Sequence, residues 1–525
     1  MSSAQTDETH GRLVRSTSAI TPWTLLSRLT GYLREKIVAL LFGASARTDT
    51  FIVAWRIPNM LRDIVGEGAM SSAFVPVYAR IQASRSEEEA RAFVGRALGT
   101  FAFLLAGLTV AGILFSPVLV DLLARDFRSD PAQFTLAVSL NRWVFPYIFL
   151  VSMAALFQGV ANARGRFAVS AAAPVLMNVG FILATLLLAP RLSEPAYALA
   201  AGVLAGGVLQ MAVQWPQLRR LRAVGRPALG WRDPDVRRVL LLMTPRLFAY
   251  GINTINLTFA TRFATGLGTS NVSRLYFANR LKELVLGGFA VALATAILPL
   301  LSRQAMEKDR GEFKTTLAFA LRLVAFVTVP ATAGLIALRV PILRVLFQGG
   351  EFRAADTLAT AGVLATLCVG LFFFAAVRVL VPAFYALEDT RLPVIAALAD
   401  CAAFLLGCFL LVPAMGLPGI GLSASLAAGV NVAILVGALR RREGRLGGRQ
   451  IARSFSRTVA AALVMGAALL AAERVLEPAA MRGLAAAAVL FALVALGAAL
   501  FWVCALLLGA PEPAELARVA RRRRE

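Results

Sequence analysis

The sequence contains few of the residues that carry catalytic, redox or metal-binding chemistry. Its 525 residues include four cysteines and a single histidine, His10, which lies in a polar N-terminal stretch. No two cysteines have C-x-x-C spacing, so we expect free thiols rather than a disulfide or a zinc site; they are Cys368, Cys401, Cys408 and Cys504. The sequence therefore predicts no metal site, no cofactor and no histidine-based catalysis in the apolar part of the chain.

Motifs for covalent chemistry are also missing. We find no glycine-rich loop with a Walker lysine for ATP, and Ser71 and Ser72 have no nearby base in the sequence. These absences disfavour a primary pump and an intramembrane hydrolase, and we expect no catalytic residue and no enzyme activity.

Charge is scarce as well. Only 16% of the residues are charged, whereas about a quarter are charged in typical soluble domains. Hydrophobic residues make up 58% of the chain, and its mean hydropathy is +0.71. A soluble protein could not bury so much apolar surface, so the composition predicts an integral membrane protein built from helices.

Long apolar runs supply the spanning segments. A spanning helix needs about 20 mainly apolar residues, and we predict fourteen such segments. Their approximate ranges are 17–43, 48–80, 92–124, 133–162, 167–190, 196–219, 237–266, 271–303, 314–348, 355–388, 392–413, 417–440, 453–474 and 483–509. Residues 1–16 lack the order of a signal peptide and are interpreted as a cytoplasmic tail.

Acidic residues are outnumbered by basic ones. The chain has 54 Lys and Arg against 30 Asp and Glu, a formal net charge of +24. In a soluble protein this excess would indicate nucleic-acid binding. Here the basic residues gather in short loops, such as 219–238 and 440–457, and in the tail 512–525. The positive-inside rule then places both termini in the cytoplasm, with no nucleic-acid partner.

A weak internal repeat divides the chain. FQGVANARGRFAV (157–169) resembles PAFYALEDTRLPV (382–394), with Arg166 aligned to Arg391. The matching segments lie six predicted helices apart, which preserves orientation and indicates two parallel halves. The alternative, that small-residue apolar helices resemble one another by composition alone, stays open.

Several charges interrupt the predicted spanning segments. Arginines lie in the first, second, eighth and tenth segments: Arg28, Arg34, Arg62, Arg280 and Arg378. Charges at membrane depth are expensive and face protein or water, and an excess of cations needs an anion or water to offset it. Because the guanidinium fork binds phosphate oxygens bidentately, we predict a phosphate-bearing ligand whose apolar part stays in lipid.

The alternative is charge pairing. Arg34 can pair with Glu35, and Arg280 with Glu283, while arginines near helix ends can reach the headgroups. Arg28 and Arg34 are six residues apart, which separates their side chains by roughly 120° on an ideal helix. A break at Gly31 would let both reach one cavity, so we predict an irregular helix there.

One long stretch, together with two shorter ones, resembles a known family. SRLTGYLREKIVALLFGASARTDTFIVAWRIPNMLRDIVGEGAMSSAFVPVYA (27–79) is similar to the opening of the MurJ (MviN) lipid II flippases. YFANRLKELVLGGFAVALATAILPLLS (276–302) and RVLVPAFYALEDTRLPV (378–394) resemble the family's eighth helix and the region from its tenth helix onwards.

The resemblance implies the fold of the multidrug/oligosaccharidyl-lipid/polysaccharide exporter superfamily. That fold has fourteen transmembrane helices, with two six-helix lobes around a central cavity and a C-terminal helical hairpin. We accordingly expect an N-lobe at 17–222, a C-lobe at 223–443 and a lipid-tail groove formed by helices 13 and 14 at 444–511.

The resemblance also implies the site. Arg28, Arg34, Arg62 and Arg280 match the cavity arginines and are expected to bind substrate, and Asp49 and Glu67 match acidic positions of the family. Beside these, we expect Glu35, Glu283 and Arg378 to be further supporting cavity charges. Two positions depart from the family pattern, since Glu35 and Asn279 stand where aspartate is common. Asn253, Asn256 and Asp400 are candidates for a sodium site but do not match its pattern.

The implied function is movement of lipid II, an undecaprenyl-pyrophosphate-linked disaccharide-pentapeptide, to the outer leaflet of the bacterial inner membrane by alternating access. Coupling to the membrane potential or to a monovalent cation is left open. Expected partners are lipid II, membrane lipids and the cell-wall synthesis or division machinery. The alternatives are a flippase for another polyprenyl-pyrophosphate-linked glycan, a cation-coupled drug exporter and a non-transporting scaffold.

Overall fold

The computed structural model describes residues 3–62, 70–307, 309–476, 483–515 and 518. Regular structure in this part of the chain is helical, and an isolated bridge between Gly349 and Phe352 is its only β-type pairing. The predicted all-α fold class is therefore confirmed. The chain forms two compact units, Met1–Ser270 and Asn271–Glu525.

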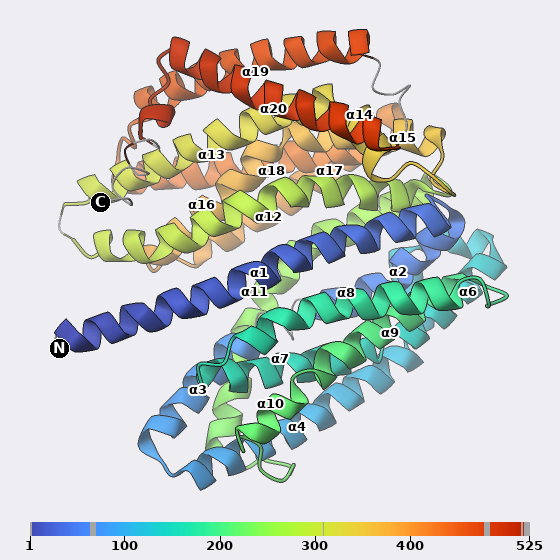
Figure 1. Cartoon of the computed structure of the whole chain (residues 1–525), viewed down its shortest axis with the longest axis vertical. Coiled ribbons are helices and arrows are strands. Elements are labelled where there is room, and N and C mark those ends of the chain that lie inside the picture. Colours follow the sequence, from blue (N-terminus) through green and yellow to red (C-terminus); the bar gives the residue numbers. More distant parts are fainter. Residues whose placement is uncertain (1–2, 63–69, 308, 477–482, 516–517, 519–525) are drawn as a thin grey trace. The chain divides into compact units, whose positions relative to one another are not determined.

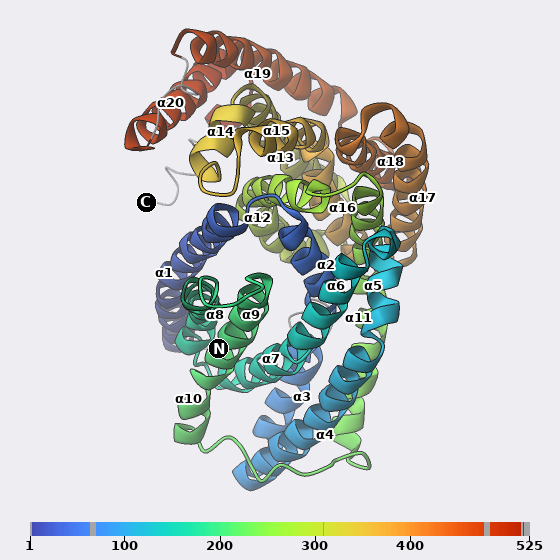
Figure 2. The same ribbon diagram turned by 90° about the vertical axis from the view of Figure 1, so that its right-hand side faces the viewer.

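The first unit is a helical bundle in which α8 packs on both α9 and α1 (Figures 1 and 2). A second group in the same unit joins α3, α4 and α7. Its helices are α1 (Ser3–Phe42), α2 (Ala46–Leu61), α3 (Ser71–Ser84), α4 (Glu87–Leu114), α5 (Ser116–Leu123), η2 (Arg125–Ser129), α6 (Pro131–Val144), α7 (Tyr147–Ala163), α8 (Ala168–Leu188), α9 (Ala196–Ala212), α10 (Trp215–Arg220) and α11 (Pro234–Gly266).

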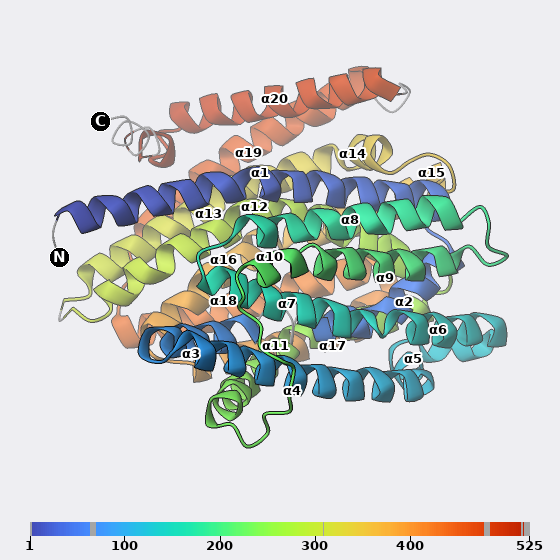
Figure 3. The same cartoon turned by 60° about the horizontal axis from the view of Figure 1, so that its bottom comes forward.

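The second unit is built on an apolar core shared by five helices, α12, α13, α16, α17 and α18. A further apolar cluster fastens α19 and α20 to α13 (Figure 3), with the rings of Phe326 and Phe501 centred 5.0 Å apart. Its helices are α12 (Asn271–Gln304), α13 (Gly311–Ala337), α14 (Arg339–Leu346), α15 (Ala354–Val369), α16 (Leu371–Ala386), α17 (Arg391–Met415), α18 (Leu417–Glu443), α19 (Gly448–Leu476) and α20 (Gly483–Leu507).

The units divide the chain at a different place from the predicted lobes. The first unit ends at Ser270 rather than at residue 222. The physical reason is that α11 packs against α3, α4 and α5 of the first unit. Helices α19 and α20, expected as a separate hairpin, belong to the second unit.

Ten helices in the described chain are long and apolar enough to cross a membrane. The bent pair α15–α16, with an angle of 44° between its halves, raises the number to 11. Each of the fourteen predicted segments coincides with a helix or with consecutive helices. Helices α1 and α11 do not meet the criteria for length and apolarity, and the segment α2–α3 is described only in part, because residues 63–69 lie outside the described chain. The count of fourteen spans therefore stays a prediction.

Helix α1 contradicts one expectation. It runs from Ser3 to Phe42 without interruption, so the predicted irregularity at Gly31 is wrong. Glycine is tolerated within a helix at a penalty of about 1 kcal/mol relative to alanine, and the surrounding apolar residues continue the helix through it. The two arginines of α1 therefore project from one regular helix.

The two repeated loops end their helices in the same way. Gly165 and Glu388 both have positive φ, 71° and 59°. After α7, the N–H of Gly165 donates to the carbonyl of Asn162, and that of Arg166 to Ala161. After α16, the N–H of Glu388 donates to the carbonyl of Tyr385, and that of Asp389 donates to the carbonyl of Phe384. This is the Schellman motif; the same two bonds also end α10 and α20, so the motif does not by itself decide whether the halves are related.

Gly165→Ala tests how much the first motif depends on glycine. A Cβ at this position would meet no atom within 4 Å, so only the left-handed backbone opposes it, and we expect a loss of about 1 kcal/mol in the free energy of unfolding. The measurement is thermal unfolding of the purified protein in detergent. Gly107→Ala, which also adds a Cβ in open space but lies inside α4, should be neutral or stabilising. Equal effects of the two substitutions would contradict this account.

Candidate functional site

Arg34 on α1 lies in a polar and aromatic pocket of the first unit. Its Nη2 donates to Oε1 of Glu35 at 2.6 Å, and its Nη1 donates to Oδ1 of Asn178 on α8 at 3.1 Å. The guanidinium also lies over the rings of Trp55 and Phe181, 5.9 and 5.6 Å from their centroids. Arg34 thus joins α1 to α8 and α2 in this structure, as the charge-pairing alternative anticipates.

Two of the supporting carboxylates are buried in the same unit. Glu35 is 7% exposed and Asp49 is 1% exposed. Asp49 lies in the first turn of α2, where the partial positive charge of the helix N-terminus favours a carboxylate. Glu67 falls in 63–69, outside the described residues.

The other two arginines of the first unit are more accessible. Arg28 is exposed on α1, and Arg62 is half-buried directly after the end of α2. Helix α2 continues through Pro58 and ends at Leu61, so Arg62 is the residue that follows its last turn.

Arg280 belongs to the second unit, on α12. It is half-buried, its Nη2 donates to the hydroxyl of Tyr276 at 2.8 Å, and its guanidinium lies 4.7 Å from the centroid of the same ring. Tyr276 is one turn away on the same helix, so this contact orients the arginine without joining two helices. Asn279 donates to a backbone carbonyl of α12, that of Leu275.

Arg378 forms an ion pair that links α16 to α12. Its Nη2 lies 2.9 Å from Oε2 of Glu283. Lys282 approaches the other oxygen of Glu283 at 3.8 Å and lies 4.4 Å from the centroid of the Phe374 ring. Glu283 thus has a partner on another helix, Arg378, which the sequence did not indicate.

The structure thus brings together Arg34 with Glu35 and Arg378 with Glu283, while the four predicted substrate arginines are divided between the two units. Sequence reasoning missed Asn178 and Phe374. Asn178 could have been found from the sequence, because it is a polar residue inside the apolar run PVLMNVGFILATLLL. Among the described residues, no group of three or more His, Cys, Asp or Glu side chains is placed to hold a metal ion.

Long apolar helices with charged side chains within them, in two compact units, define this chain as an all-α, multi-span membrane protein. A family model described as "Lipid II flippase MurJ" matches residues 38–490. The chain belongs to this family.

Individual relatives agree with the family assignment. A Burkholderia cenocepacia protein named "Lipid II flippase MurJ" is 37% identical over 457 residues, which cover 86% of this chain and 89% of that protein. A Vibrio cholerae protein named "Probable lipid II flippase MurJ" is 37% identical over 431 residues, covering 81% of this chain and 82% of the relative.

Solved structures agree on the fold. A structure titled "Lipid II flippase MurJ, inward closed conformation" superposes with a TM-score of 0.74 at 22% identity, covering 95% of this chain and 99% of the other. An inward-facing multidrug resistance MATE family transporter of the MOP superfamily superposes with a TM-score of 0.64 at 16% identity. The match covers 79% of this chain and 94% of the transporter. These likenesses show that the chain has the fold expected from the sequence.

Arg34→Ala tests the buried pair. The substitution leaves the Glu35 carboxylate without its cation, and removing one partner of a buried pair costs about 3–5 kcal/mol. We expect much less folded protein, and recovery of most of it in Arg34→Ala/Glu35→Gln, where no buried charge is left over. The measurements are size-exclusion yield and thermal unfolding in detergent. Arg28→Ala, at an exposed position of the same helix, serves as the control; equal instability of the single and double variants would refute a stabilising pair.

Proposed function

We propose that this protein moves lipid II from the cytoplasmic to the outer leaflet of the bacterial inner membrane. The observation that carries the proposal is the match of the MurJ family model over residues 38–490. The extensive similarity to relatives named as lipid II flippases supports it. The transport involves no covalent chemistry, and the enzymes of cell-wall synthesis or division are the expected partners because they make and use this lipid.

The arginines are proposed to bind the pyrophosphate. Arg28 is exposed, and Arg62 and Arg280 are half-buried, so part of each side chain is open to a ligand. Such guanidinium groups can bind phosphate oxygens through two parallel hydrogen bonds. Both terminal nitrogens of Arg34 already contact Glu35 and Asn178. A phosphate that binds Arg34 must therefore first displace at least one of these two contacts.

The driving force is proposed to come from the membrane potential or from a monovalent cation. An inside-negative potential favours outward movement of an anion, by about 2.3 kcal/mol per charge at 100 mV. If the cavity arginines neutralise the pyrophosphate only in part, the headgroup crosses with a net negative charge. The membrane potential then contributes a favourable free energy to its outward movement. A cation that binds one conformation better than another would instead shift the population between the two.

Alanine variants of the arginines test this function. With flipping of lipid II in proteoliposomes normalised to folded protein, Arg28→Ala, Arg62→Ala, Arg280→Ala and Arg34→Ala/Glu35→Gln should each lose nearly all activity. Lysine should restore part of it at some positions, since it keeps the charge but not the fork. Arg378→Ala is the control, because its ion pair with Glu283 predicts less folded protein but normal activity per molecule.

The proposed substrate and the proposed binding residues are tested by different results of this experiment. Normal rates in the four variants would show that their charges are structural and that the pyrophosphate proposal is wrong. Wild-type protein that moves another polyprenyl-pyrophosphate-linked glycan but not lipid II would refute the substrate. Export of cationic drugs without flipping would favour the drug-exporter alternative instead.

The proposed orientation places both termini and the 219–238 loop in the cytoplasm, because basic loops are retained inside. In a variant without its native cysteines, Arg222→Cys should resist an impermeant maleimide in intact cells and react after permeabilisation. Ser193→Cys, at an exposed position of the α8–α9 loop, should react in intact cells. The reverse pattern would overturn the orientation.

A further inference from the structure

A cavity lies within the first unit, and none of the arginines proposed to bind lipid II lines it. It has a volume of about 620 Å³ and is bounded by α4, α7, α10 and the segment that follows α10. Its floor is apolar: Leu98, Met153, Phe157 and Leu218 line it and are at most 7% exposed. The floor is thus suited to a hydrocarbon chain rather than to a small polar ion.

The remaining lining of this cavity is strongly basic. Four arginines contribute to it, and no acidic residue does; they are Arg91, Arg219, Arg222 and Arg226. Arg219 rests on the ring of Trp215, 5.1 Å from its centroid. The Nε of Arg91 is buried and has no hydrogen-bond partner among the described residues. A buried donor without a partner is costly, so the site favours an anion that would accept its hydrogen bond.

Carboxylates close in sequence to this cavity are engaged by other arginines. Asp233 lies 2.6 Å from Arg96, and Asp235 lies 2.8 Å from Arg85. The cations of the cavity are therefore not the partners of these acids.

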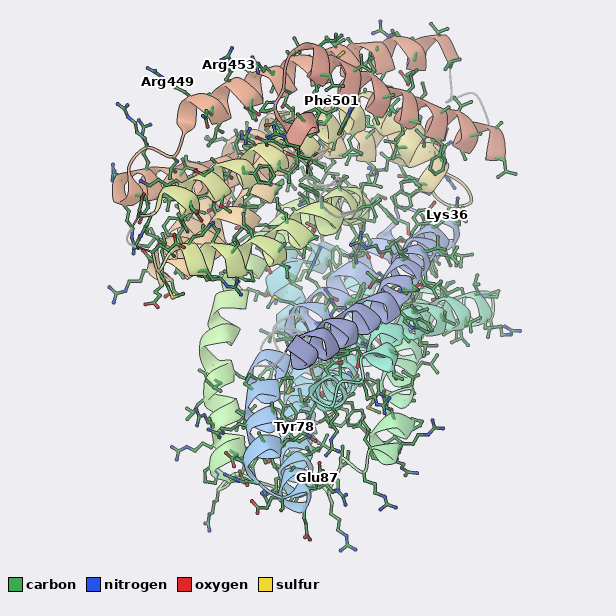
Figure 4. The ribbon with its side chains drawn as sticks, turned by 60° about the vertical axis from the view of Figure 1, so that its left-hand side comes forward. Lys36, Tyr78, Glu87, Arg449, Arg453 and Phe501 are labelled. Carbon is green, nitrogen blue, oxygen red and sulfur yellow. The ribbon has the colours of Figure 1, made fainter. Side chains whose placement is uncertain are left out.

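Glu87 is engaged in the same way. It lies 2.7 Å from Arg164, which also donates to the hydroxyl of Tyr78 at 2.9 Å; Figure 4 shows Tyr78 and Glu87 towards the same end of the first unit. Burial opposes the charge of Arg164, but its hydrogen bonds with Tyr78 and Glu87 outweigh burial and raise the pKa of its guanidinium. Glu87 is thus held by a cation outside the cavity.

The segment after α10 is fastened to α4, so the cavity is already formed. Gly225 donates its N–H to the carbonyl of Arg91 at 3.1 Å, and Ala228 donates to that of Gly95 at 3.2 Å. A Cβ on Gly95 would come within 2.4 Å of the carbonyl oxygen of Arg226, so only glycine permits this close approach. At Arg222 the chain takes a positive φ of 45°, and this residue lines the cavity.

We propose that this cavity binds an anionic phospholipid. The phosphate contacts Arg91 and Arg219, with Arg222 beside them, while an acyl chain follows the apolar floor. A free phosphate shares the first interaction but not the second. The membrane is the nearer source, because α4 and the α6–α7 segment that contribute to the cavity both qualify as membrane spans, and basic pockets between spanning helices bind lipid headgroups. The site lies apart from the lipid II proposal and does not depend on it.

Thermal unfolding of the full-length protein in neutral detergent tests the proposal. Dihexanoyl-phosphatidylglycerol should raise the unfolding temperature in a saturable way, whereas dihexanoyl-phosphatidylcholine and inorganic phosphate at the same concentrations should not. Arg91→Gln and Arg219→Gln should each weaken the apparent affinity for phosphatidylglycerol about tenfold or more. Arg219 is exposed on α10, so its substitution does not threaten folding.

Two further variants make the result specific. Arg220→Gln removes an exposed arginine of the same helix that does not line the cavity, and it should leave the affinity unchanged. Ala102→Phe fills part of the cavity without changing any charge, and it should abolish the response to the lipid. An equal response to inorganic phosphate would identify a soluble anion as the ligand, and wild-type affinity in Arg91→Gln and Arg219→Gln would place the lipid elsewhere. Either result would overturn the proposal.

Discussion

Lipid cannot solvate a charge, and this constraint explains most of the polar contacts within the helices of this protein. Arg34 contacts the buried carboxylate of Glu35, the amide of Asn178 and the faces of two aromatic rings, and these contacts join α1 to α8. Arg378 forms an ion pair with Glu283, which ties α16 to α12. Each of these contacts is made inside one compact unit. The charges are therefore part of what holds the helices of each unit together, besides any role in binding.

The sequence predicts the helices well because apolar length is a property of each segment alone. All fourteen predicted segments coincide with helices. Helix α1, which carries Arg28 and Arg34, falls short of a membrane span by composition, whereas α12, which carries Arg280, qualifies with a mean hydropathy of 2.4. A charge lowers the hydropathy of the helix that carries it, but a long apolar run on the same helix can outweigh that effect.

Contacts between helices were much harder to predict, because they depend on which helices are neighbours. Nothing local to the sequence pairs Arg34 with Asn178 or Arg378 with Glu283. The repeat shows a related limit. Sequence similarity aligns Arg166 with Arg391, whereas the Schellman bonds place Arg166 opposite Asp389, two residues earlier. The residue with positive φ sets the turn, and it is Gly165 in one copy and Glu388 in the other. Because these two side chains differ, sequence similarity does not show that the two positions are equivalent.

The surroundings of Arg34 give it a particular part in the proposed transport. Its Nη2 donates to Glu35, and its Nη1 donates to Asn178 on α8. Either bidentate fork of a guanidinium uses at least one of these two nitrogens, so a pyrophosphate bound in this way competes with Glu35 or with Asn178 for Arg34. A ligand changes a conformational equilibrium only through contacts that differ between the states, and loss of the contact between Arg34 and α8 would provide such a difference.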